Sequence, residues 1–191
     1  MIFHFATNTS GSGAEPRRDR IAQQFDTPNP KPPGPDMRLS LQILLIALAL
    51  VAGLALMIRV APMKPARWHV DPETASRPST PNAYILRDRD GDAPAYVTPL
   101  SPSDTAAALH RIVMSLPYTT RIAGDLAQGH ATYVARTPLM RFPDAVSIKL
   151  TPAGSGTRVA IFSRSRFGQS DFGANRARVA RIIAALEAEG P

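Results

Sequence analysis

The pattern of apolar and polar positions divides the chain into one isolated apolar run and a later region with helix and strand periodicity. Residues 39–58 contain no charged side chain and only two clearly polar ones, Ser40 and Gln42. Twenty such residues form a helix about 30 Å long, which matches the hydrocarbon core of a bilayer. The pattern therefore predicts a transmembrane anchor over residues 37–60, with residues 39–58 in contact with the lipid bilayer.

A cleaved signal peptide is the main alternative to an uncleaved anchor, because both are apolar runs near the N-terminus. We favour the anchor because residues 53–55 offer only a poor small-x-small cleavage site. Basic residues are nearly balanced on the two sides, so the positive-inside rule gives little asymmetry. We expect a single-pass membrane protein with its C-terminal domain on the non-cytoplasmic side. Met37 followed by Arg38 resembles the start of a signal anchor, so a mis-set start before residue 37 is a further alternative.

Two proline-rich segments flank the apolar run. Residues 1–36 are polar and rich in Gly, Ser and Pro, so we predict a disordered tail. Residues 61–94 have few periodic positions, so we predict an extended linker, in which Trp68 is either an interfacial anchor or packed on the domain. His69 and Asp71 share one face of an extended strand, as two metal ligands do, but no further cluster of ligands accompanies them. We therefore predict no metal site and expect a local hydrogen-bonded pair.

The region 95–191 has the periodicities of an α+β globular domain. An apolar stripe at i, i+3, i+4 and i+7 predicts a helix after the cap candidates Ser103 and Asp104, and a second stripe predicts a helix over residues 171–189. Between them, alternating residues predict strands at 119–126, 130–137, 144–152 and 157–166. The sequence thus predicts about four antiparallel strands with two helices on one face of the sheet.

Composition and charge restrict the function. The chain has no cysteine, which excludes disulfides, thiolate catalysis and cysteine-ligated metals. The net charge is +7, and residues 37–67 contain four basic residues and no acidic one, which is typical of a membrane-surface pattern. We expect no nucleic-acid partner, because aromatic residues make up only 6% of the chain. The sequence contains no phosphate-loop, zinc-protease or dinucleotide motif, so we expect no cofactor and assign no catalytic residue.

The stretch SRSRFGQSDFGANRARV, residues 163–179, is the most unusual part of the domain because it combines many polar residues with the start of an apolar helix. When the inward stripe of the last helix is continued upstream, three residues point toward the sheet: Phe172, Asn175 and Arg176. Two arginines fall on the outer side: Arg178 and Arg181. Since an unpaired buried polar group costs about 1–3 kcal/mol, the inward groups require partners.

Two interpretations of this stretch stay open. In the first, Asp171 and Asp144 pair with the arginines, and Asn175 binds the backbone at a strand end. In the second, the stretch forms an anion pocket with six ligand-binding candidates: Arg164, Arg166, Ser170, Asp171, Asn175 and Arg176. Three residues are secondary candidates: Asp144, His69 and Asp71.

Four motifs, WHVDP, PNAYIL, YVARTPLMRFPD and SRSRFGQSDFGANRARV, together resemble the domain-of-unknown-function 1499 family. The resemblance covers about residues 66–188, and the last motif is the most specific. Family members are bacterial and often membrane-attached, and the family has no established activity. The resemblance therefore implies a fold, and it marks residues 163–179 as the most family-specific region, but it implies no function. Ala145 follows Asp144 where many members have a polar or aromatic residue, and this departure argues against a functional pair of acidic residues at that position.

The sequence favours a membrane-anchored, non-catalytic domain. Such a domain binds a small anion, a lipid headgroup or a protein partner through the corner between Arg164 and Arg176. The alternative is a hydrolytic enzyme that uses Asp144 or Asp171 with the adjacent arginines.

Overall fold

The long helix α2 (Met37–Arg59) is the one helix among the described residues that is long and apolar enough to cross a membrane. An 18-residue window of it has a mean hydropathy of 2.8, and none of its residues is buried, although a signal sequence has the same properties. Contacts divide the chain after residue 45, within α2, and residues 46–190 belong to the second unit. The predicted disordered tail lies outside the described residues except at positions 34 and 36. The computed structural model describes residues 34, 36–138 and 140–190.

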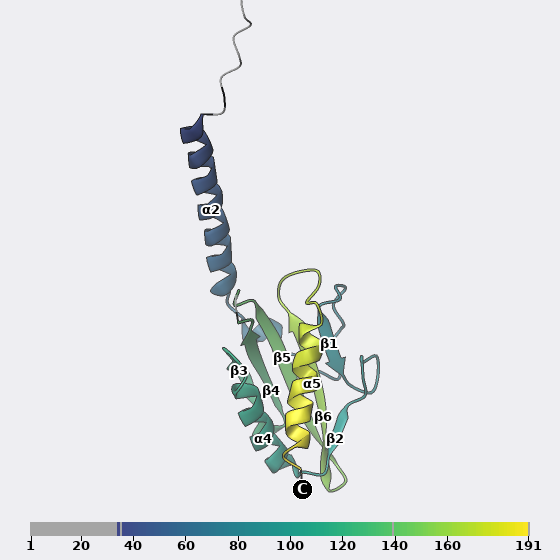
Figure 1. Cartoon of the computed structure of the whole chain (residues 1–191). Helices are drawn as coiled ribbons and strands as arrows, with labels where there is room; N and C mark the ends of the chain where they lie inside the picture. Colours follow the sequence, from purple (N-terminus) through teal and green to yellow (C-terminus); the bar gives the residue numbers. More distant parts are fainter. Residues whose placement is uncertain (1–33, 35, 139, 191) are drawn as a thin grey trace, which may run out of the picture. The chain divides into compact units, whose positions relative to one another are not determined.

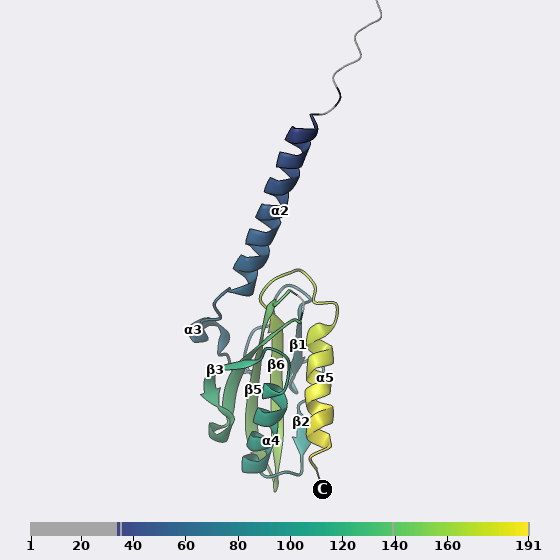
Figure 2. The ribbon, with the colours of Figure 1, turned by 60° about the vertical axis from the view of Figure 1, so that its left-hand side comes forward.

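The second unit contains one antiparallel sheet with two helices, α4 and α5, on the same face (Figure 1). In the turned view of Figure 2, α4 lies in front of the strands and α5 runs along their right-hand side. The strand order is β1-β6-β5-β4-β3, and the short β2 also pairs with β6. After α2, the elements in chain order are α3 (Pro65–Trp68), β1 (Ala83–Leu86), β2 (Tyr96–Thr98), α4 (Pro102–Met114), β3 (Thr120–Asp125), the 3-10 turn η1 (Leu126–Gln128), β4 (His130–Arg136), β5 (Pro143–Ala153), β6 (Gly156–Ser165) and α5 (Ala174–Glu187).

The four predicted strands are present as β3 to β6, and the α+β class with two helices on one face is confirmed. The number of strands is wrong, because the sheet has six strands rather than four. The two additional strands, β1 and β2, contain only four and three residues, which is too short for a visible alternation. Both pair antiparallel with β6, at successive stretches of its length.

The helix face of the sheet carries the main hydrophobic core. Leu109 and Val113 of α4 and Ile182 of α5 are fully buried against Ile148 and Ile161 of the central strands. Each such side chain stabilises the fold by about 1.5–3 kcal/mol relative to exposure. The start of α4 differs slightly from expectation. Its cap is Ser101, whose hydroxyl accepts from the Asp104 amide, because Pro102 already occupies the first helical position.

Residues 61–82, which we name the strap, cover part of the opposite face of the sheet. Trp68 is 7% exposed and packs with Met63 against Val134 and Ala145. Of the two roles considered for Trp68, packing on the domain is therefore the one observed. Together with β1, the strap makes residues 61–94 part of the folded unit rather than the extended linker we expected.

Polar contacts fasten the strap along its length. The His69 ring bonds the Thr132 hydroxyl over 2.8 Å, and the His130 ring donates to the Val70 carbonyl over 3.1 Å. Three charged pairs or clusters continue the contact: Asp71 with Lys149, Glu73 with Arg158, and Arg87 with the carbonyls of Pro72, Glu73 and Ala75. Strap and sheet therefore form one hydrogen-bonded unit.

Candidate functional site

The corner where β6 ends and α5 begins is organised by Asn175. Its side chain is fully buried, as the apolar stripe predicted. The side-chain amide lies 2.8 Å from the Asn82 carbonyl and 2.7 Å from an Asp171 carboxylate oxygen, and it donates to them. Its oxygen accepts from the Ser163 hydroxyl over 2.6 Å. Asn175 therefore joins β1, β6 and the start of α5, and the predicted bond to strand-end backbone is present.

Arg178 is the cation of this corner, which corrects two expectations. We placed Arg178 on the outer side of the helix, yet its side chain is 12% exposed and its guanidinium lies 2.5 Å from Asp144. Arg176, expected inside, is exposed. The reason is helical geometry: position 178 lies three residues after Asn175 and four before Ile182, so it belongs to the buried stripe.

Phe172 is also placed differently from expectation. It is 98% exposed, because α5 begins only at Ala174 and the preceding residues form a turn. Its φ of +51° is in the left-handed region. The stripe of a helix cannot be continued beyond the first helical residue, so the upstream extrapolation fails there.

Ser170 and Asp171 stabilise this turn with their side chains. The Ser170 hydroxyl accepts from the Phe172 amide over 3.2 Å. The Asp171 carboxylate accepts from the amides of Gly173 and Asn175 over 3.1 and 2.7 Å. An aspartate at this place also suits the positive end of the helix dipole. The two side chains therefore hold the turn that precedes α5, whose N-cap residue is Gly173.

Arg164 and Arg166 lie on the other face of the sheet. Since successive strand residues alternate between faces, Ser163 faces the helices whereas Arg164 faces the strap. The Arg164 guanidinium lies 4.6 Å from the Trp68 ring centroid and donates to the Arg67 carbonyl. Arg166 donates to the Pro62 carbonyl. The six predicted ligand-binding residues are thus split between two faces and do not form one pocket.

Asp144 and Asp171 are both engaged by donors of the protein. Asp144 is 2% exposed and binds Arg178. Burial raises the pKa of Asp144 above its usual value, while Arg178 and the Ser165 hydroxyl act in the opposite direction. Neither carboxylate is among the residues that line the hollow between the ends of α4 and β4 and the start of α5.

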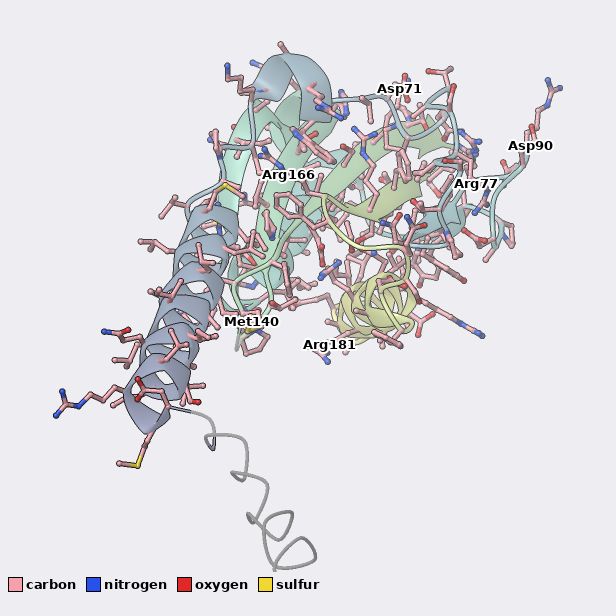
Figure 3. The ribbon with its side chains drawn as sticks, turned by 90° about the horizontal axis from the view of Figure 1, so that it is seen from above. Asp71, Arg77, Asp90, Met140, Arg166 and Arg181 are labelled. Carbon is pink, nitrogen blue, oxygen red and sulfur yellow. The ribbon has the colours of Figure 1, made fainter. Side chains whose placement is uncertain are left out.

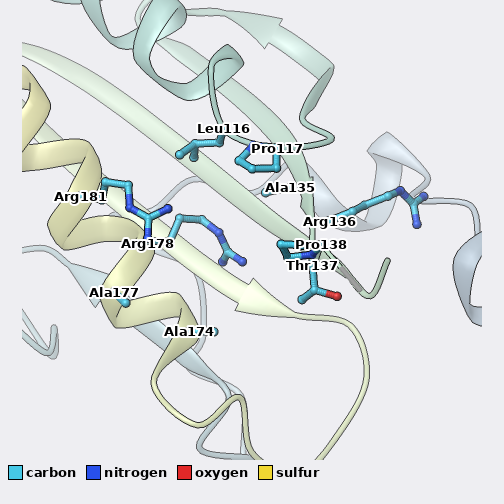
Figure 4. A pocket seen from close by; sticks show the side chains of 10 residues that line it. All are labelled: Leu116, Pro117, Ala135, Arg136, Thr137, Pro138, Ala174, Ala177, Arg178 and Arg181. Carbon is cyan, nitrogen blue, oxygen red and sulfur yellow. The ribbon is translucent and has the colours of Figure 1, made fainter. Parts of the chain in front are cut away.

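The nearest hollow to this corner has a volume of about 220 Å³ and lies between the end of α4, the end of β4 and the start of α5 (Figure 4). The guanidinium groups of Arg178 and Arg181 lie at its wall, whereas that of Arg136 points away from it (Figure 4). The rest of the lining consists of Leu116 and Pro117 after α4, Ala135, Thr137 and Pro138 at the end of β4, and two alanines of α5. Because Arg178 already binds Asp144, the hollow offers only Arg181 as a cation without a recorded partner among the described residues.

Seven cationic residues gather at the end of the sheet where β4 and β6 end and β5 begins, and we name this surface the basic end. Figure 3 views this end from above, with Arg166 labelled. None of the seven takes part in the ion pairs found among the described residues. The basic end consists of Arg59, Lys64, Arg67, Arg136, Arg141, Arg164 and Arg166. Those ion pairs use Arg77, Arg111, Arg121, Lys149, Arg158 and Arg178.

Burial and neighbouring like charges both disfavour the charged form of two arginines of the basic end. Burial, followed by the charges of Arg166 and Arg141, lowers the pKa of Arg136. Burial, followed by the charge of Arg67, lowers the pKa of Arg164. In both cases no carboxylate contributes. These arginines bind backbone carbonyls and aromatic rings instead: Arg136 donates to the Ala61 carbonyl, and Arg141 lies over the ring of Tyr118.

Sequence reasoning found part of the basic end. The excess of basic residues over 37–67 was visible, but Arg136 and Arg141 carried no local signal. They join the group only because β4 ends beside the start of β5, with Arg136 opposite Pro143. A pairing between distant strands is needed to bring these residues to the strap.

The predicted pair of His69 and Asp71 does not form. Instead, His69 stacks on His130 with ring centroids 4.1 Å apart, and Asp71 binds Lys149. Among the described residues there is no group of three or more side chains suited to hold a metal. The two residues therefore fasten the strap to the sheet.

A family model described as "Protein of unknown function (DUF1499)" matches residues 72–186. The match covers more than half of the 191 residues and includes the strap from Pro72 onward, the sheet and both covering helices. No curated protein matches the sequence.

Proposed function

Because the chain belongs to the DUF1499 family, as its motifs predicted, and this family has no assigned function, we propose a function from the chain's own charge distribution. The protein is a membrane-anchored, non-catalytic domain whose basic end binds anionic lipid headgroups. One observation carries the proposal: seven cations that have no carboxylate partner within residues 34, 36–138 and 140–190 gather beside the residues that follow the apolar helix.

Chain connectivity supports the proximity of the basic end to a bilayer. Arg166 donates to the carbonyl of Pro62, which lies three residues beyond Arg59, the last residue of α2. Three residues span at most about 11 Å. If α2 spans the membrane, Arg166 lies within about one to two Debye lengths of the surface, where its attraction to anionic headgroups is reduced by salt but not abolished, since the Debye length is about 8 Å at physiological ionic strength. Each basic residue near an anionic surface contributes about 1 kcal/mol.

The state of the carboxylates supports a non-catalytic role. A hydrolytic enzyme requires an acid or base within reach of a substrate. Asp144 is buried against Arg178, and Asp171 accepts the first amides of the α5 turn, so both carboxylates have structural partners. The hydrolytic alternative predicts turnover on a phosphatase or esterase panel that is lost on Asp171→Asn.

The proposal is tested by lipid selectivity at the boundary of the protein. The full chain is reconstituted into phosphatidylcholine vesicles that contain spin-labelled phosphatidylglycerol or spin-labelled phosphatidylcholine, and the immobilised fraction of each label is measured by electron spin resonance. We expect the anionic label to be preferred about five-fold or more at low salt, and the preference to fall as salt is raised.

Two charge variants with equal net charge make the test specific. The first changes four cations of the basic end: Lys64→Gln, Arg67→Gln, Arg141→Gln and Arg166→Gln. The control changes four exposed arginines outside it: Arg89→Gln, Arg111→Gln, Arg176→Gln and Arg181→Gln. Fluorescence of Trp68 verifies that both variants keep the strap folded. The proposal requires that the first variant loses the preference and the control retains it; equal losses would contradict it.

A further inference from the structure

The loop between β6 and α5 presents an aromatic side chain that the domain itself does not use. Phe172 is 98% exposed, more than any other large apolar residue among the described residues, including those of α2. Its φ of +51° is a backbone conformation that side chains with a Cβ rarely adopt. Both properties are unfavourable for a protein in water, so the structure holds Phe172 outward against local preference.

The loop is fixed on both sides of Phe172. The carbonyl of Gly168 accepts from the buried Asn82 side chain over 2.7 Å. Asp171 accepts from the amides of Gly173 and Asn175, which ties the loop to the first turn of α5. Phe172 is therefore displayed by hydrogen-bonded neighbours rather than by a loose segment.

Phe172 lies at the end of the sheet that carries the basic end. The loop begins at Arg166, which binds Pro62 in the strap. Among the described residues beyond Val60, five large apolar side chains are exposed, and three of them, Tyr118, Met140 and Phe172, lie at this end of the sheet. The other two are Val97 in β2 and Met114, the last residue of α4.

The positions of these residues follow from strand pairing. Tyr118 precedes β3, whose first residue Thr120 lies opposite Val134 near the end of β4. Met140 lies between β4 and β5 and is next to Arg141. Exposed apolar side chains interspersed with unpaired arginines are typical of surfaces that sit in the headgroup region of a bilayer.

We propose that Phe172 inserts into the interfacial region of the membrane to which the chain is anchored. This inference rests on the proposed function. It adds an apolar contact between Phe172 and the boundary of headgroups and acyl chains, and this contact does not depend on the charge of the lipids. The cations of the basic end select anionic headgroups, whereas Phe172 fixes the orientation of the domain by burying its ring. Burial in the interface also explains why a strained, fully exposed phenylalanine occupies this position.

The absence of native cysteine permits a direct test of depth in the full chain. A single cysteine at Gln169, an exposed neighbour of Phe172, carries an environment-sensitive fluorophore, and quenching by spin-labelled lipids is measured in phosphatidylcholine vesicles. The control label is at Ser155, in the hairpin at the opposite end of β6. We expect lipid quenching at position 169 and about two-fold or greater loss of it on Phe172→Ser. Quenching at 169 no greater than at 155, or unchanged by Phe172→Ser, would overturn the inference.

A second variant separates this inference from the proposed function. Phe172→Gly removes the ring and relieves the positive φ, so we expect a higher melting temperature in detergent together with the same loss of quenching. A melting temperature that falls instead would mean that the ring stabilises the domain itself, and would overturn the inference. If the wild-type chain shows no preference for anionic lipid but its label at position 169 is quenched, the proposed function alone is rejected. If the wild-type chain shows the preference but the label at position 169 is not quenched more than that at 155, insertion alone is rejected.

Discussion

Replacing Arg178 by methionine tests the account of the corner, because among the described residues it is the one cation that binds a buried carboxylate. Arg178 donates to Asp144 over 2.5 Å and to Asn175 and Ser163 over 2.6 and 2.9 Å. In Arg178→Met, Asp144 stays 2% exposed and keeps only the Ser165 hydroxyl as a side-chain partner. Breaking a buried ion pair from one side costs about 3–5 kcal/mol.

The possibility of protonation limits this cost and makes it depend on pH. An unpaired Asp144 can avoid a buried charge by taking up a proton. With a reference pKa of 3.8, keeping the carboxyl protonated at pH 7 costs about 4.4 kcal/mol, at about 1.4 kcal/mol per pH unit, so the loss of stability cannot exceed this value. At pH 5 the same limit falls to about 1.6 kcal/mol. A carboxyl whose pKa is raised on folding contributes stability that is present below 3.8 and lost as pH rises through the folded pKa. We therefore expect a loss of about 3–4 kcal/mol at pH 7 and less than about 2 kcal/mol at pH 5 from this charge.

Urea unfolding of the full chain in detergent, followed by Trp68 fluorescence, measures the loss. The control is Arg181→Met, one turn away on the same helix, exposed and without a recorded partner, which should change stability by less than about 0.5 kcal/mol. Asp144→Asn in the Arg178→Met background should recover part of the loss at pH 7. Equal losses in Arg178→Met and Arg181→Met, or a loss that does not change with pH, would refute the reasoning.

Three further predictions concern the strap and the anchor. Burial, followed by the charge of His69, lowers the pKa of His130. The neutral ring therefore contributes folding stability that is fully present above pH 6.5 and is lost as pH falls through the lowered pKa, and His130→Gln should reduce the change in melting temperature between pH 7.5 and pH 5. Trp68→Ala should cost about 3–5 kcal/mol in circular-dichroism melts, whereas Arg67→Ala, which is exposed, should cost far less. A single cysteine at Ser155 should react with an impermeant maleimide added to intact cells, because we expect the domain on the non-cytoplasmic side; labelling only after lysis would show the opposite orientation. The mass of the purified protein should include residues 37–59, as expected for an uncleaved anchor.

The sequence predicted those parts of the fold that repeat over many residues. The hairpin β5–β6 alternates over ten or more residues, and α4 and α5 each show a full apolar stripe, so their periodicity is unambiguous. The short strands β1 and β2 are stabilised only by pairing with β6, and the strap is fastened by contacts with residues sixty or more positions away. No local pattern encodes such contacts, which is why this region resembled a linker.

The candidate site was predictable to the same degree. Asn175 could be placed inside because it shares the stripe of Val179. Arg178 was misplaced because the stripe was counted upstream from Val179, its direct neighbour, which faces a different direction on a helix; counted from Asn175 and Ile182, position 178 lies on the buried side. Arg164 and Arg166 lie on the opposite face of the sheet from Asn175. This separation could not be predicted, because the sequence does not show which face of the sheet α5 covers.

Hydrogen–deuterium exchange of the full chain in nanodiscs tests the central claim most directly. Backbone amides of residues 136–142 and 164–173 are compared between discs of phosphatidylcholine alone and discs that contain phosphatidylglycerol, with the hairpin at residues 153–157 as the internal reference. If the basic end binds anionic headgroups, exchange slows in the first two segments when phosphatidylglycerol is present and stays constant in the hairpin. Identical exchange in both kinds of disc would contradict the account.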